Sequence, residues 1–155
     1  MIMKTGKLVL ALVLLISIIS MSCDMYDDGI PPKAVRTQFR SMVDGARDIE
    51  WDREGQNWSV SYEIGRVEYE TLYDPNGKWL VTEKEVYLSD VPQNIKAFLA
   101  ASPEYGNLPF DDNTVEYYQT PSGNFYRFEL SNQGRDIKVD VTEKGVVTPA
   151  RYDLF

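Results

Sequence analysis

Apolar residues recur at helical spacing in two short stretches of the chain, residues 31–43 and 91–102. Their apolar faces consist of Val35, Phe39 and Met42 in the first stretch and of Ile95, Phe98 and Leu99 in the second. Pro32 and Pro92 suit the first turn of a helix, where a missing N–H group costs nothing. The spacing therefore predicts two helices that begin in the same way.

Each predicted helix is followed by four runs in which apolar and polar residues alternate, the pattern of a β-strand with one buried face. The runs cover residues 48–52, 57–64, 67–73 and 78–86 after the first helix, and 114–118, 125–130, 136–142 and 145–150 after the second. Gly55 matches Gly123 and Gly77 matches Gly145. The chain therefore repeats a helix followed by four antiparallel strands, with extra residues at 103–113 in the second copy.

The stretch DPNGKW, residues 74–79, contains the residue types of a calcium loop and also those of a hairpin turn. The equivalent stretch of the second repeat, residues 142–147, keeps the glycine but lacks the Asp and Asn ligands. A calcium loop of the EF-hand kind also needs a glycine at its sixth position and a glutamate at its twelfth. Gly77 is fourth from Asp74, so the stretch is predicted to be a turn that needs a residue with positive φ.

The N-terminus has the composition of an export signal. Lys4 and Lys7 precede an apolar segment, residues 8–19, that is short for a transmembrane helix. Cys23, the single cysteine, follows directly and resembles the lipidated cysteine of a bacterial lipobox, although Ser20 departs from its usual leucine. The resemblance implies cleavage before Cys23 and a lipid anchor in the membrane. An ordinary secretory signal is the alternative.

The repeated helix motif, the strands NWSVSYE and NFYRFEL, the DPNGKW turn and the leader together resemble PepSY-like, or beta-lactamase-inhibitor-like, bacterial envelope lipoproteins. The resemblance covers residues 31–150. It implies an α+β fold in which two tandem repeats form one antiparallel sheet of about eight strands, with the helices on one face. It transfers no catalytic residue. We expect a signal peptide at 1–22, a tether at 23–30 and repeats at 31–86 and 87–155.

Strand alternation assigns the side chains of each repeat to two faces of the sheet. The face predicted to lie beneath the helices comprises Ile49, Trp51, Trp58, Val60, Tyr62, Tyr69, Tyr73, Val115, Tyr117, Tyr126, Phe128, Leu130, Ile137, Val139 and Val141. The opposite face is acidic. Its candidate binding residues are Glu50, Glu63, Glu68, Glu70, Glu116, Tyr118, Phe125, Arg127 and Glu129, with Tyr118 and Phe125 expected as exposed aromatic rings. The alternative is that this acidic face is only exposed to solvent and binds nothing.

The composition limits the chemistry that the chain can perform. Sixteen Lys and Arg residues against 24 Asp and Glu give a net charge of −8, and no basic run suits nucleic acid. The sequence has no histidine, the commonest general base. Asp111 and Asp112, beside Asn113, form an acidic pair in the extra segment, but such residues commonly cap turns.

We therefore expect no catalytic residue, metal ligand or cofactor. The sequence favours a non-enzymatic module that binds a protein or peptide. A basic partner and an inhibitor role are the finer expectations. It is expected in the bacterial cell envelope, anchored by lipid to the outer membrane and facing either the periplasm or the surface. The alternatives are a structural accessory subunit of an envelope complex and, less favoured, a carboxylate-based hydrolase.

Overall fold

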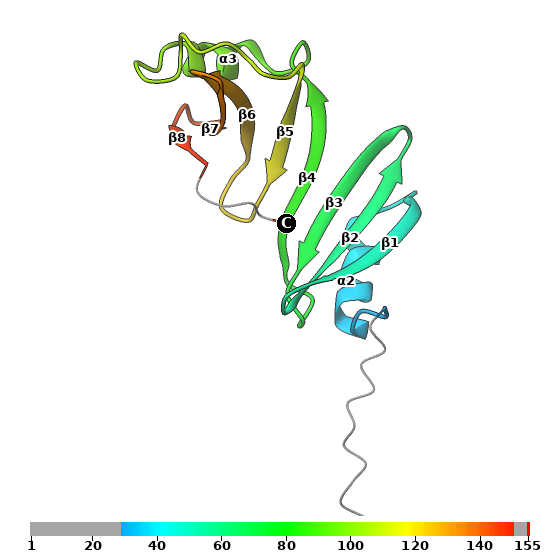
Figure 1. Ribbon diagram of the computed structural model, residues 1–155. Coiled ribbons are helices and arrows are strands. Elements are labelled where there is room, and N and C mark those ends of the chain that lie inside the picture. Colours follow the sequence, from blue (N-terminus) through cyan, green and yellow to red (C-terminus); the bar gives the residue numbers. More distant parts are fainter. Residues whose placement is uncertain (1–28, 151–154) are drawn as a thin grey trace, which may run out of the picture.

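The computed structural model describes residues 29–150 together with Phe155, and these form a single antiparallel sheet with two helices (Figure 1). Each of the eight strands pairs with the next one along the chain. The elements are α2 (Lys33–Met42), β1 (Arg47–Glu54), β2 (Asn57–Ile64), β3 (Val67–Tyr73), β4 (Trp79–Tyr87), α3 (Gln93–Ala100), β5 (Thr114–Gln119), β6 (Phe125–Asn132), β7 (Arg135–Thr142) and β8 (Val147–Pro149). The predicted α+β fold of two tandem repeats in one sheet is confirmed.

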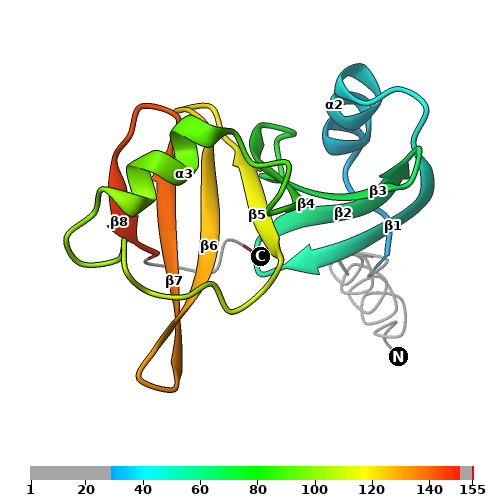
Figure 2. The same ribbon diagram turned by 90° about the horizontal axis from the view of Figure 1, so that it is seen from above.

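Both helices lie on the same face of the sheet, as strand register across β4 demonstrates. Val60 packs in the cluster under α2 and pairs with Thr71, which in turn pairs with Thr82 of β4. Further along β4, Val86 pairs with Val115, which packs under α3. Thr82 and Val86 are four residues apart on one strand, so their side chains share a face. Figure 2 shows α3 across the second half of the sheet and α2 at the first half.

Each helix covers its own apolar core. Val35 and Phe39 of α2 are buried against Trp58, Tyr62 and other residues of β2 and β3. The core under α3 contains Val91, Ile95, Leu99, Tyr105, Val115, Phe128, Leu130, Val139 and Val141. These residues confirm most of the predicted buried face. Met42, placed on the same helical face as Phe39, is exposed instead because it is the last residue of α2.

Ile49 was expected in the core, and that prediction is wrong. Its side chain is 44% exposed. The pairing between β1 and β2 is irregular between Arg47 and Glu50, and Asp48 between them has a φ of +50°. Such a bulge inserts an extra residue and interrupts the alternation of side chains, so Ile49 points out of the core.

The DPNGKW stretch forms the predicted hairpin turn. The side chain of Asp74 accepts hydrogen bonds from the backbone N–H groups of Asn76 at 2.8 Å and Lys78 at 2.9 Å. Gly77 has a φ of +86°, and a Cβ atom on it would lie 2.7 Å from the carbonyl oxygen of Ala34 in α2. The turn thus needs glycine for its backbone and also for its contact with the helix.

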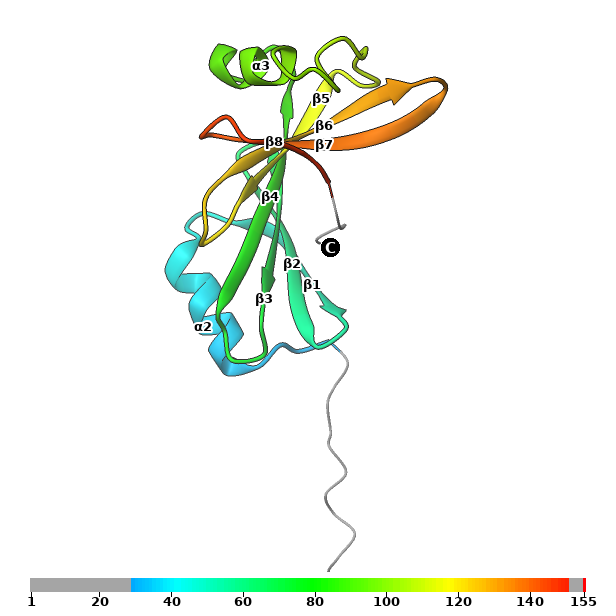
Figure 3. The same ribbon diagram turned by 90° about the vertical axis from the view of Figure 1, so that its left-hand side faces the viewer.

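The sheet is strongly twisted, and its two halves are inclined to each other, with β4 running through both (Figure 3). A third apolar cluster lies where they meet, on the face away from the helices. Its buried members are Leu72, Val81 and Tyr118, and Leu80, Phe125 and Phe155 pack against them. Within residues 29–150, neither helix is long and apolar enough to cross a membrane.

Candidate binding face and cleft

Strand register places the nine candidate residues on the face away from the helices. Glu50, Ser61, Glu70 and Glu83 stand side by side on β1 to β4, and the same row continues through Tyr118 and Phe125. Glu63 stands beside Glu68, Glu116 beside Arg127, and Glu129 beside Lys138. The nine candidate residues therefore lie on one shared surface of the sheet.

Tyr118 was predicted to be an exposed aromatic residue, and that expectation is wrong. Its side chain is 3% exposed, and Phe125 stacks on it with ring centroids 4.8 Å apart and is itself half-buried. The Arg127 guanidinium lies 4.9 Å from the centre of the Tyr118 ring. Leu72 and Val81 of the first repeat also pack against the Tyr118 ring, because the two halves of the sheet are inclined towards each other at this point.

The charges of the second repeat are largely neutralised within this face. Arg127 is buried and binds Asp140 through two hydrogen bonds, of 2.7 and 3.1 Å. Lys138 binds one oxygen of Glu116 at 3.0 Å, and the Tyr118 hydroxyl donates to the other at 2.8 Å. Burial lowers the pKa of Arg127, but the hydrogen bond and charge of Asp140 outweigh it, so the pKa is raised overall. The negative field of the face therefore comes mainly from β1 to β4, the strands of the first repeat.

A cleft opens in this acidic region because β3 and β4 separate. Their pairing ends at Glu70 and Glu83, although β4 continues along β5 to Tyr87 and β3 begins at Val67 against β2. The cleft has a volume of about 720 Å³, within the range of small-ligand pockets. The separation of β3 and β4 is visible in Figure 1.

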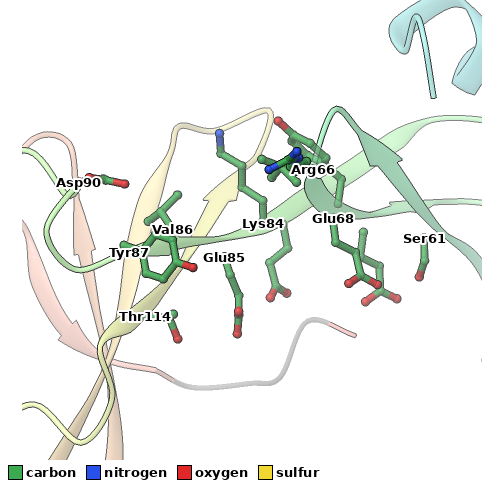
Figure 4. Close-up of a pocket in the computed structure, with 13 residues that line it drawn as sticks. Ser61, Arg66, Glu68, Lys84, Glu85, Val86, Tyr87, Asp90 and Thr114 are labelled. Atoms are coloured by element: carbon green, nitrogen blue, oxygen red, sulfur yellow. The ribbon is translucent and has the colours of Figure 1, made fainter. Parts of the chain in front are cut away.

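The two sides of the cleft carry opposite charge (Figure 4). Glu68 and Glu85 project to the side away from the helices, whereas Lys84 and Arg66 project to the other side. Glu70 and Glu83 belong to the acidic side because they share the row of Ser61. The Lys84 ammonium is held over two aromatic rings, 5.5 Å from the centroid of Tyr69 and 5.7 Å from that of Tyr117.

Two carboxylates at the point where β3 and β4 separate are poorly solvated. Burial raises the pKa of Glu70, and the nearby charges of Glu54, Asp52 and Glu68 raise it further. Burial also raises the pKa of Glu83, and the nearby Tyr118 hydroxyl only partly opposes this shift. Both carboxylates would hold their negative charge more easily beside a cation.

Sequence reasoning missed the part that β4 plays in this site. The alternation of residues 78–86 was recognised, but its side chains were assigned to neither face. The signal was present in the run of Glu83, Lys84 and Glu85, which puts two acids on one face and a base on the other. The separation of β3 from β4 depends on register and twist, which the sequence pattern does not specify.

Carboxylates also meet outside the cleft, where the extra segment passes β6 and β7. Oxygens of Asp111, Glu129 and Asp136 lie within 4.8 Å of one another, which is close enough to share a cation. Two of these residues are exposed, and exposed acidic groups of this kind commonly occur without an ion. Asp112 points its carboxylate at the neighbouring backbone N–H of Asn113, as a turn-capping residue does.

No known protein-family model matches the chain, and no curated protein sequence matches it. Solved structures do. A BLIP-like protein of Bacteroides fragilis superposes with a TM-score of 0.66 at 21% identity, over 81% of this chain and 92% of its own. The chain has a BLIP-like fold. A DUF2874 family protein of Bacteroides ovatus has the same TM-score at 14% identity, over 77% of this chain and 88% of its own.

A third match is a protein of Bacteroides eggerthii, named provisionally as periplasmic. It has a TM-score of 0.64 and 19% identity, over 77% of this chain and 86% of its own. Identities this low establish the BLIP-like fold alone, because one fold hosts many functions. The resemblance to PepSY-like proteins and the lipid anchor remain predictions, and Cys23 lies outside the described residues.

Proposed function

We propose that the protein is a non-enzymatic binding module of the bacterial cell envelope, and that its acidic sheet face binds a cationic protein or peptide. The observation that carries the proposal is the concentration of carboxylates on β1 to β4, where Glu50, Glu70 and Glu83 stand in one row. Like charges on neighbouring strands destabilise a sheet. A cationic partner would offset that cost and would be steered to the face by its field.

A lipid anchor at Cys23 would place this face at a membrane surface. The proposal rests on the position of the cysteine directly after the apolar segment of the leader. Replacing Cys23 by Ala should move the protein from the membrane fraction to the soluble fraction, because one side chain carries the anchor. A variant that stays in the membrane fraction would show that the leader is retained or that another attachment exists.

The binding proposal is tested by capturing partners from an envelope extract on the full chain and measuring their association at increasing salt. The double variant Glu50→Lys/Asp52→Lys reverses two exposed charges of the face outside the cleft. It should slow association and weaken the salt dependence. The control Asp44→Lys/Glu104→Lys makes the same change of charge in the exposed loops that follow α2 and α3.

Two outcomes would overturn the proposal in different ways. A partner that binds both double variants equally, with unchanged salt dependence, would leave the acidic face without a binding role. It would favour the alternative function, a structural accessory subunit held by other surfaces. Turnover of a substrate by the captured or isolated protein would favour the carboxylate-based hydrolase instead.

A further inference from the structure

The separation of β3 and β4 leaves two strand edges facing each other across the cleft. Residues Lys84 to Tyr87 of β4 have register partners in β5 but none in β3, and Val67 to Tyr69 of β3 pair only with β2. In an antiparallel strand, every second residue directs both its N–H and its C=O group to the same side. Both edges therefore direct backbone hydrogen-bonding groups into the cleft, and such edges readily accept another strand.

The side chains around these edges form two chemically different walls. On the side away from the helices, the wall is acidic and consists of Glu68, Glu70, Glu83 and Glu85. On the helix side, Tyr69 and Val86 give apolar surface, and the ammonium of Lys84 repels other cations. A strand lying between the walls would present alternate side chains to each of them.

We propose that the cleft accepts an extended segment of the cationic partner, which adds as a strand along the free edge of β4 and carries basic residues alternating with apolar ones. The basic residues would face the four glutamates, and the apolar residues would face Tyr69 and Val86. This inference rests on the proposed function and narrows it, because it names the conformation and the sequence pattern that the acidic face would select.

Charge complementarity favours this occupant over two others. Nucleic acid and anionic lipid would meet the acidic wall with like charge. A second copy of the chain would have to offer one of its own edge strands. On β1, the residues facing away from the helices include Glu50 and Asp52, which would repel the cleft, and β8 has only three residues. A basic segment from another protein would not be repelled by the acidic wall and would need no edge strand from a second copy of this chain.

The test measures binding of the fluorescent peptide acetyl-Lys-Val-Lys-Val-Lys-Val-amide to the full chain in a non-ionic detergent by fluorescence anisotropy. The double variant Glu70→Gln/Glu83→Gln keeps the shape of the cleft and removes two charges. It should weaken binding by about tenfold or more, because close charge pairs at interfaces contribute at least that factor. The matched control Asp44→Asn/Glu104→Gln removes two exposed charges from the loops that follow α2 and α3, and it should change binding by about threefold at most because exposed charges outside the face are screened.

Two altered peptides test the strand pairing and the alternation. Methylating the backbone nitrogens of the lysines in one peptide, or of the valines in another, blocks hydrogen bonding along one edge without changing any side chain. At least one methylated peptide should lose binding. The block peptide Lys-Lys-Lys-Val-Val-Val has the same composition and should bind about tenfold more weakly, because it cannot match both walls.

The possible failures of the two proposals can be separated. If Glu70→Gln/Glu83→Gln weakens the peptide but both methylated peptides bind like the parent, the strand addition is wrong while the acidic face still binds cations. The alternating peptide could bind as expected while the envelope partner binds Glu50→Lys/Asp52→Lys as tightly as the parent. In that case the cleft inference stands and the broader face proposal fails. Absence of peptide binding at low salt overturns the strand addition.

Discussion

At the scale of single residues, two of the ion pairs of the sheet should differ greatly in their contribution to stability. The side chains of Arg127 and Asp140 are 3% and 18% exposed, whereas those of Arg47 and Glu63 are 64% and 35% exposed. Arg127→Met leaves a poorly solvated carboxylate without its partner and should lower the free energy of unfolding by about 3–5 kcal/mol. Arg47→Met should cost about 1 kcal/mol or less. Urea denaturation of both variants checks this, and similar losses would contradict it.

A second residue-scale prediction concerns the pH dependence of stability at Glu83. Its pKa is raised in the folded protein, so its contribution to stability is complete below the ordinary carboxyl pKa of 4.5 and is lost as the pH rises through the folded pKa. Glu83→Gln has no ionisable group at this position, so it does not lose stability in this way as the pH rises. The variant should gain stability over the parent as the pH rises from about 4.5 towards 7, as thermal unfolding across that range can measure. A difference that is constant with pH would show that Glu83 is well solvated.

At the scale of elements, the turn between β3 and β4 should be less tolerant of a side chain than the turn between β2 and β3. Gly77 and Gly65 both have positive φ, of +86° and +69°, but only the Cβ position of Gly77 is blocked by α2. Gly65→Ala should cost about 1 kcal/mol from backbone strain. Gly77→Ala should cost a further 1–3 kcal/mol, roughly the penalty of overpacking. Equal melting temperatures would mean that α2 moves aside freely.

Helices and strands were predictable from sequence because their signals are local, whereas relations between strands were not. Val35 and Phe39 reveal their buried face by spacing, and Gly77 identifies its turn because few other residues tolerate that φ. The bulge that exposes Ile49, by contrast, depends on pairing with β2. The burial of Tyr118 depends on Leu72 and Val81, which come from the other repeat. The candidate face was therefore predicted as a set of residues, while its buried centre and its cleft were not.

At the scale of the whole molecule, the two repeats should unfold together. β4 and β5 pair over six residues, and the cluster around Leu72, Val81 and Tyr118 joins side chains of both repeats. Phe39→Ala under α2 and Leu99→Ala under α3 should each lower the stability of the whole domain by about 2–5 kcal/mol in one transition. Calorimetry of both variants is the measurement. Two separate transitions, each shifted by only one of the substitutions, would show that the repeats are independent.

The neighbour-to-neighbour order of the strands also determines how the chain can fold as it is synthesised from its N-terminus. Each hairpin needs only the residues that have just appeared, and short loops close at little entropic cost. The long connection between paired strands is residues 88–113, which include α3 and bring β5 back beside β4. The first repeat can therefore assemble before the second has been synthesised, and we expect formation of the β4–β5 contact to be the slow step on which completion of the sheet depends.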